Sequence, residues 1–150
     1  MNSPDPNAGA ISVKNEKLEI DAELLPFFKE ESTEIFASVE RALGEWEANP
    51  SDLAPAHIIY RNFHTLKGSA NSIGLNPIGR LSHDMEQIMK SILADQLHPD
   101  LQILAPAIRT IAVGMQILLQ EISPDSCCPR LLTEIESKVL LLRNDLRTQA

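Results

Sequence analysis

Apolar residues recur at helical spacing along most of this chain, and this periodicity restricts the fold more than any other feature. At about 100° per residue, the apolar residues between Tyr60 and Ile73 fall on one side of a helix. A second stripe of the same period lies between Pro77 and Leu93. The sequence contains no sustained period-2 run of the kind that predicts a strand. A hydrophobic content of 43% with only 4% aromatic residues also favours helix packing, so we predict an all-α fold.

Five helices are expected, and several of them are bounded by proline. Their approximate ranges are Asp21–Ala48, Asp52–Ile73, Pro77–Ala94, Pro99–Glu121 and Pro129–Thr148. Pro106 should kink the fourth helix or shift its start, because proline cannot donate a backbone hydrogen bond. Four of the helices should form an antiparallel bundle, with the additional C-terminal helix packed on its side. Residues 1–18 are predicted to be a disordered arm, and residues 19–150 a single domain.

The segment from His64 to Gly68 carries the strongest chemical signal. His64 lies opposite the buried stripe of its helix, and Lys67 and Gly68 lie one turn later on the same outward face. A neutral imidazole nitrogen is nucleophilic near neutral pH, and an ammonium can neutralise phosphoryl oxygens. Glycine costs about 1 kcal/mol relative to alanine inside a helix, but its missing side chain lets another protein's active site approach. These residues predict a histidine that carries a phosphoryl group.

The third expected helix supplies a group that could orient this histidine. His83, Glu86 and Lys90 lie on its polar face. If the helix packs antiparallel to the preceding one across the short turn at residues 74–76, this face flanks His64. Glu86 is then a candidate to accept a hydrogen bond from Nδ1 of His64, which would fix the tautomer and leave Nε2 exposed.

The run FHTLKGSA at residues 63–70, followed by Gly74 and by LSHDME at residues 81–86, resembles the histidine phosphotransfer (Hpt) domain. The spacing is most similar to the N-terminal Hpt domain of CheA-like chemotaxis and twitching-motility kinases. The resemblance covers about residues 21–146, which is most of the chain. It implies the same helical architecture that the periodicity predicts.

The resemblance also implies a role for individual residues. His64 matches the phosphorylated histidine, and Lys67 and Gly68 match the Lys-Gly step that follows it. Glu86 matches the acidic residue that orients the imidazole, and His83 the auxiliary polar residue beside it. Such domains accept phosphate on Nε2 from a histidine kinase catalytic domain and pass it to an aspartate of a response-regulator receiver domain. They do not hydrolyse ATP themselves, and no cofactor or metal is expected in this chain.

The net charge of −8 argues against nucleic acid as a partner, because like charges would repel. Positive charge on Lys67, Arg61 and Arg80 should therefore stand out near His64. A receiver's active site is acidic, so a locally basic patch would suit it. We expect Tyr60 and Arg61, together with Gly68, to dock the partner.

Nothing in the sequence predicts a membrane or secretory location. The apolar stretch Leu101–Leu119 is interrupted by Pro106 and Arg109, which should make it too broken for a membrane span. The N-terminus lacks the charged and apolar regions of a signal peptide. We therefore expect a cytoplasmic monomer.

Two other classes of function remain open at this stage. His64, His83 and Glu86 could form a two-histidine, one-carboxylate metal site with an open position. This reading leaves Lys67 and Gly68 unexplained, and a nearby ammonium would oppose a dication. A helical interaction domain without chemistry is the third reading, although it leaves the presence of His64 unexplained.

Other noticeable residues have structural explanations. Cys127 and Cys128 are adjacent and would make a strained disulfide, so we expect reduced thiols without a function. His57 and His98 lie near helix starts and should be solvated. Trp46 shares a helix with apolar neighbours and should pack in the core or at its rim.

Overall fold

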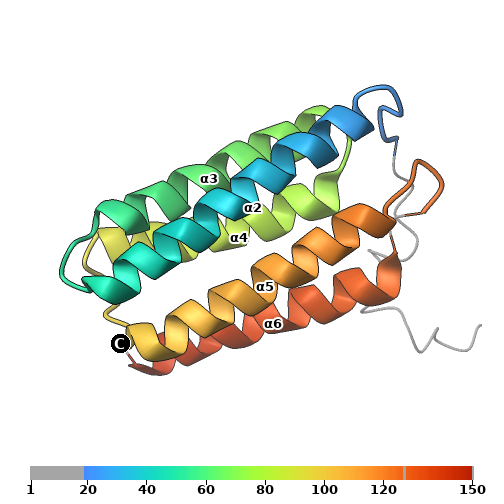
Figure 1. The fold of residues 1–150 in the computed structure, drawn as a ribbon. Helices are drawn as coiled ribbons and strands as arrows, with labels where there is room; N and C mark the ends of the chain where they lie inside the picture. Colours follow the sequence, from blue (N-terminus) through green and yellow to red (C-terminus); the bar gives the residue numbers. More distant parts are fainter. Residues whose placement is uncertain (1–18, 127, 150) are drawn as a thin grey trace, which may run out of the picture.

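The computed structural model describes residues 19–126 and 128–149, which form five α-helices (Figure 1). The helices are α2 (Leu25–Ala48), α3 (Ala54–Ser72), α4 (Asn76–Leu93), α5 (Leu101–Glu121) and α6 (Pro129–Gln149). Among the described residues, the only β-type pairing is an isolated bridge between Ser123 and Ser126. The all-α prediction is confirmed. The predicted N-terminal arm, residues 1–18, and Cys127 lie outside the described residues.

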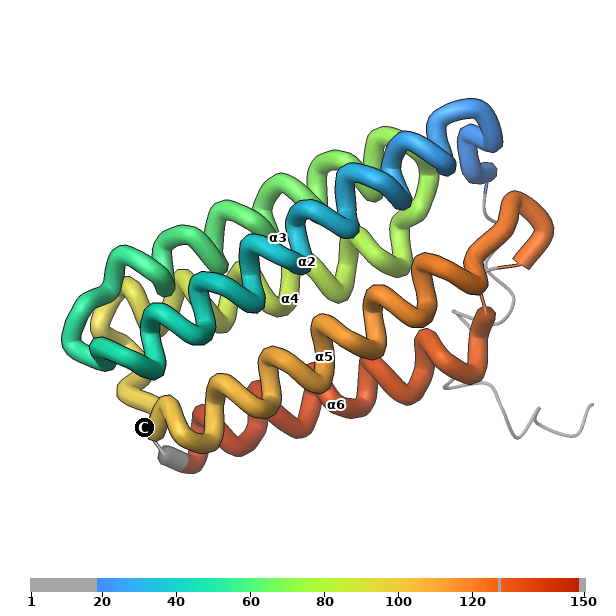
Figure 2. The backbone as a smooth tube through the Cα atoms, in the orientation of Figure 1, coloured from blue at the N-terminus to red at the C-terminus, as the bar shows by residue number. Residues whose placement is uncertain are grey.

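Consecutive helices run in opposite directions (Figures 1 and 2). α3 packs against both α2 and α4, and α5 packs against α2 and α6. The C-terminal helix α6 also contacts α4. This arrangement confirms the predicted helical bundle with an additional C-terminal helix.

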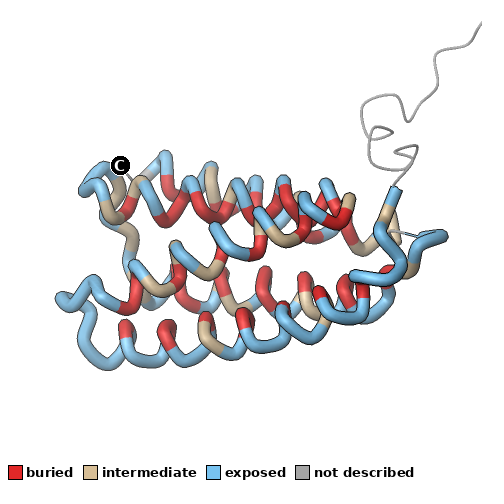
Figure 3. The backbone as a smooth tube through the Cα atoms, turned by 90° about the horizontal axis from the view of Figure 1, so that it is seen from above, coloured by how far each residue is buried: buried red, intermediate tan, exposed pale blue. Residues whose placement is uncertain are grey.

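Each helix turns one stripe of side chains toward the interior, as the buried positions in Figure 3 show. Phe63 and Leu66 of α3 and Met85 of α4 are fully buried. Burial of each such side chain contributes about 1.5–3 kcal/mol relative to leaving it exposed. Trp46 is also buried, at 4% exposure, which confirms its predicted role in packing.

Polar side chains set the starts of two helices. The Asp21 carboxylate accepts hydrogen bonds from the backbone N–H groups of Glu23 and Leu24, at 3.0 and 3.1 Å. These bonds form a turn ahead of α2, so the helix begins at Leu25 and not at the predicted Asp21. Asp100 caps α5 by accepting from the backbone N–H of residue 102 at 2.9 Å, and α5 therefore begins two residues later than expected.

Pro106 lies inside α5, and the helix runs past it without a break (Figure 2). The proline stands in the second turn, where its missing N–H removes only one hydrogen bond from the helix. α5 is also long and apolar enough to cross a membrane by length and composition, with a mean hydropathy of 1.5. Pro106 and Arg109 were predicted to interrupt this stretch too much for a membrane span. By length and composition alone, that prediction was wrong. In the bundle, the inward face of α5 packs on α2 and α6.

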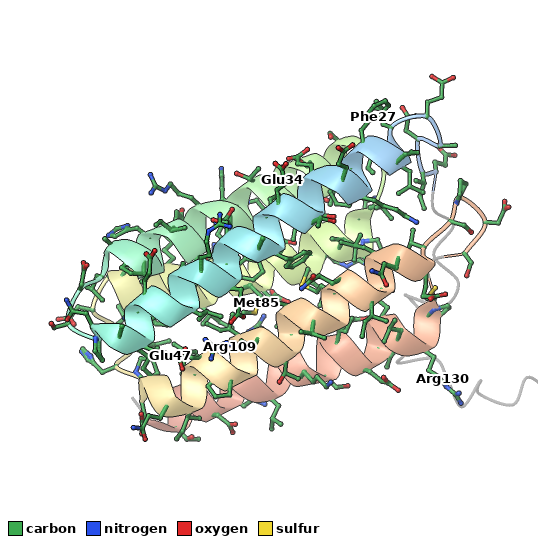
Figure 4. The ribbon with its side chains drawn as sticks, viewed as in Figure 1. Phe27, Glu34, Glu47, Met85, Arg109 and Arg130 are labelled. Atoms are coloured by element: carbon green, nitrogen blue, oxygen red, sulfur yellow. The ribbon has the colours of Figure 1, made fainter. Side chains whose placement is uncertain are left out.

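An arginine holds α5 against α2. Arg109 donates from Nε to Glu40 at 2.9 Å and from Nη2 to Glu47, which lies beside it in Figure 4. The hydrogen bond from Arg109 lowers the pKa of the Glu47 carboxyl, and the two carboxylates raise the pKa of the guanidinium. The one basic residue of this apolar helix is thus held by two partners on α2.

The turn between α3 and α4 positions these two helices side by side. Gly74 adopts a φ of 86°, a left-handed conformation that side chains rarely adopt. The N–H of Leu75 donates to the carbonyl of Ala70 at 2.9 Å, which closes the C-terminal end of α3. A Cβ atom on Gly74 would overlap the carbonyl oxygen of Glu19. This position therefore requires glycine both for its backbone and for space.

Gly74→Ala should lower the free energy of unfolding by more than about 1 kcal/mol, because strain and overlap act together. Gly44→Ala is the matched control: a Cβ there meets nothing within 4 Å, and alanine favours the helix interior. We expect the control to raise stability by about 0.5–1 kcal/mol. Urea denaturation followed by circular dichroism measures both changes. Equal effects of the two substitutions would contradict this account of the turn.

Candidate functional site

His64 projects from α3 into solvent, with 61% of its side chain exposed. Phe63, one residue before His64, and Leu66, two residues after it, are fully buried. The 3.6-residue period of the helix accounts for this difference, because positions one apart point about 100° away from each other. The predicted exposure of the imidazole is therefore confirmed.

Glu86 reaches His64 from the neighbouring helix α4. Its Oε1 lies 2.8 Å from Nδ1 of His64, and its side chain is only 6% exposed. An ionised carboxylate can only accept hydrogen bonds, so Nδ1 carries the proton in this pair. In the neutral form of the imidazole, Nε2 is then the nitrogen with the free lone pair.

The second oxygen of Glu86 pairs with Lys67. Nζ of Lys67 lies 2.6 Å from Oε2, and the lysine side chain is 25% exposed. Burial by itself raises the pKa of the Glu86 carboxyl, but hydrogen bonds and charge from Lys67 and His64 outweigh it and hold the pKa below its ordinary value of 4.5. Glu86 is therefore ionised at neutral pH, although it is buried.

Two further rings surround this pair. Nδ1 of His83 lies 3.9 Å from Oε2 of Glu86, which is too long for a hydrogen bond, and the His83 side chain is half exposed. Tyr60, one turn before His64, stacks on the imidazole with a centroid separation of 6.3 Å and an interplanar angle of 19°. Tyr60 thus restrains the ring from one side, while Glu86 restrains it through Nδ1.

The surface beside His64 is open at Gly68. A Cβ atom built on Gly68 would meet nothing within 4 Å, so the packing of this chain does not require glycine there. Next to it, Ser69 donates from Oγ to Glu31 of α2 at 3.0 Å. The helix therefore gives up the stability that alanine would provide, and it keeps an unobstructed approach to His64.

The charges around the site differ in part from the prediction. Arg61 is exposed, as expected, but the ammonium of Lys67 is neutralised by Glu86 and does not add a free positive charge to the patch. Phe27 of α2, one turn before Glu31, is 68% exposed and was not predicted as a functional residue (Figure 4). Its only signal in the sequence was a large aromatic residue outside the buried stripe.

Comparison with known proteins agrees with this geometry. The Hpt domain family matches residues 23–144 of the chain. The chain belongs to the Hpt domain family. This membership, together with the relatives described next, places the chain in histidine phosphotransfer of two-component signalling.

Two curated relatives of this Hpt domain are much longer proteins. It is 29% identical to the sensor histidine kinase CheAY of Helicobacter pylori over 97 residues, which are 65% of this chain and 12% of the relative. It is 34% identical to the chemotaxis protein CheA of Bacillus subtilis over 68 residues, which are 45% of this chain and 10% of the relative. The matches thus span about a tenth of each relative. No solved structure matches the chain significantly.

The geometry also bears on the metal-site alternative. His64, His83 and Glu86 do come together, as that alternative requires. Both oxygens of Glu86, however, already contact cationic or N–H groups, and the ammonium of Lys67 would oppose a dication. Within residues 19–126 and 128–149, no group of three or more His, Cys, Asp or Glu side chains is arranged to hold a metal ion.

The remaining histidines and the described cysteine lie outside the site. His57 is exposed on α3, and His98 is exposed and contacts Asp95 at 3.1 Å, so both are solvated as predicted. Cys128 is half buried and is not in a disulfide. None of these three residues contacts His64 or Glu86.

Glu86→Gln tests the charge at the centre of the site. Because the folded pKa of Glu86 is lowered, its carboxylate stabilises the fold above about pH 4.5, and this stabilisation is lost as pH falls through the lowered folded pKa. We expect the variant to be less stable than wild type by about 1–2 kcal/mol at neutral pH and to converge with it in acid.

Urea denaturation of both proteins, repeated from about pH 7 down to about pH 3, measures this convergence. Glu30→Gln, which removes an exposed carboxylate of α2, is the control and should follow wild type throughout. A stability difference between wild type and Glu86→Gln that is independent of pH would contradict the assigned role of the carboxylate.

Proposed function

We propose that this Hpt domain accepts a phosphoryl group on Nε2 of His64 from a histidine kinase catalytic domain and transfers it to an aspartate of a response-regulator receiver. The observation that carries the proposal is the 2.8 Å contact between Nδ1 of His64 and the buried carboxylate of Glu86. This contact makes Nε2 the free nucleophile and leaves it on the solvent-exposed side of the ring.

The reaction is an in-line displacement at phosphorus. The lone pair of Nε2 forms a P–N bond while the bond from phosphorus to the leaving oxygen of the donor breaks. In the second transfer, an aspartate oxygen of the receiver attacks phosphorus, and the P–N bond returns its electrons to Nε2. The imidazole becomes more positive as the P–N bond forms, and the carboxylate of Glu86 offsets that charge through Nδ1–H.

Lys67 has two tasks in this scheme. Its contact with Oε2 helps to keep Glu86 ionised, so that Nδ1 retains its proton. An ammonium has three N–H donors, and those not directed at Glu86 are available to phosphoryl oxygens arriving at Nε2. His83 lies 3.9 Å from the carboxylate of Glu86, so it acts on that group only electrostatically and not through a hydrogen bond.

The partner-docking surface consists of Gly68, Tyr60 and Arg61, to which we add Phe27. Gly68 provides space, Tyr60 restrains the ring, and Arg61 provides an exposed positive charge toward an acidic receiver site. Phe27 supplies an exposed apolar contact on α2. We propose that the domain acts in the cytoplasm as a monomer and takes its phosphoryl group from a catalytic domain of the CheA type, in the same chain or in another.

His64→Gln should abolish phosphorylation and leave the fold intact, because the residue is exposed and contributes little to packing. Purified protein is treated with phosphoramidate, a small donor that transfers phosphate to imidazole without a protein partner. The rate at which acid-labile phosphate forms is measured, and peptide mass spectrometry locates it, because exposed histidines such as His57 and His98 can also react. Circular dichroism checks that the variant stays helical. Glu86→Ala should slow labelling without preventing it. Acid-labile phosphate that forms on His64→Gln as fast as on wild type would overturn the assignment of the phosphorylated residue.

Gly68→Gln should block transfer between proteins while leaving chemistry at His64 intact. Phosphorylated wild type is first offered to a panel of receivers, and the fastest acceptor is chosen. Gly68→Gln should then lose transfer to that receiver by at least about tenfold but still be labelled by phosphoramidate, because a small donor needs no docking surface. Gly44→Gln, at the other helical glycine with open space, is the control and should transfer normally. Equal loss in both variants would contradict a docking role for Gly68.

A further inference from the structure

A groove of about 390 Å³ lies between α4 and α6, on the side of α4 that adjoins the phosphotransfer site. Its apolar lining includes Ile88 of α4, Leu97 of the connection that follows, and Leu146 of α6. Ile88 and Leu146 are each only 4% exposed, so they belong to the surface of the core. A groove of this size accommodates a few side chains of a peptide.

The rim of this groove carries two guanidinium groups and one carboxylate, so a single positive charge, on Arg147, lacks a carboxylate partner among the described residues. Arg143 and Arg147 of α6 both line it. Arg143 pairs with Asp84 of α4 at 2.7 Å, which links the two helices. No carboxylate of the described residues lies within ion-pair distance of Arg147. In a chain with a net charge of −8, this uncompensated guanidinium over an apolar floor distinguishes the groove from the acidic surface of α2.

The groove and the phosphotransfer site share a side chain. His83 lines the groove, and its Nδ1 lies 3.9 Å from Oε2 of Glu86, the carboxylate that orients His64. A segment bound between α4 and α6 would therefore reach the edge of the phosphotransfer site at His83. It would approach from the side opposite to α2 and Phe27, because α3 and α4 separate α2 from α6 around the bundle.

We propose that this groove docks a short acidic segment with an apolar residue, carried by the protein that exchanges a phosphoryl group with His64. The proposal rests on the proposed function. Charge complementarity selects the occupant: a carboxylate of the segment pairs with Arg147 while an apolar side chain covers Ile88 and Leu146. A segment of this kind would add affinity and orientation to the contacts around Gly68. The side chains that it contacts, those of Arg147, Ile88 and Leu146, take no part in the transfer itself.

Arg147 also lies in the last turn of α6, where a positive side chain favours the helix dipole. A test must therefore separate binding from helix stability. Arg130 is a useful comparison because it is exposed on the same helix and projects into solvent at the opposite end (Figure 4). Circular dichroism on both variants shows whether either loses helix.

The probe is the capped hexapeptide ELEELE, titrated into the intact chain and followed by backbone amide NMR shifts. Shifts should cluster at groove residues such as Ile88 and Leu97, and the neutral peptide QLQQLQ should bind much more weakly. Arg147→Glu should weaken binding of ELEELE by at least about tenfold, while Arg130→Glu leaves it unchanged. The affinity should also fall as salt is raised.

Three outcomes would overturn the groove as an acidic docking site. They are shifts spread over the basic residues generally, equal binding of QLQQLQ, and equal weakening by Arg147→Glu and Arg130→Glu. The phosphotransfer proposal is judged separately by phosphoramidate labelling, which Arg147→Glu should leave unchanged, whereas His64→Gln should lose labelling but still bind ELEELE. Labelling that does not depend on His64, with peptide binding retained, would end the phosphotransfer proposal and leave the groove in place.

Discussion

The site depends on one buried carboxylate. Glu86 is 4% exposed, and an ion in that position is costly unless each oxygen has a partner. His64 hydrogen-bonds one oxygen at 2.8 Å and Lys67 forms an ion pair with the other at 2.6 Å, so two residues one turn apart on α3 pair with a group on α4. The same contacts that offset the cost of burial keep the carboxylate ionised and determine which nitrogen of the imidazole is protonated. The same contacts therefore stabilise the buried carboxylate and orient the imidazole of His64.

The rest of the bundle holds α3 and α4 in the register that this contact needs. The left-handed turn at Gly74 reverses the chain between the two helices and leaves no room for a side chain. On the far side, Arg109 joins α5 to α2 through two carboxylates, and α6 closes the bundle against α4. Rigid helices would suit the proposed transfer, because it requires one ring to be presented at a fixed orientation.

The surface around His64 differs in shape and charge between its two sides. Toward α2 the approach is open at Gly68. Toward α6 it continues into a groove with an apolar floor and a positive rim at Arg147. The imidazole between them is restrained by Tyr60 and Glu86. A partner that contacts both sides would be oriented as well as held, which is the requirement for in-line transfer.

The sequence alone determined the class of fold, the helices to within four residues at each end, and the outward position of His64, because a 3.6-residue period shows which face of a helix is buried. Glu86 as the orienting residue came from the spacing of the motif. Periodicity does not show what lies opposite an exposed face, so only the tertiary structure decided that Lys67 pairs with Glu86 and does not remain a free charge. It also decided that Arg147 stands over a groove formed with α4. Such features arise between helices that are distant in the chain, and their geometry depends on packing that no single helix encodes.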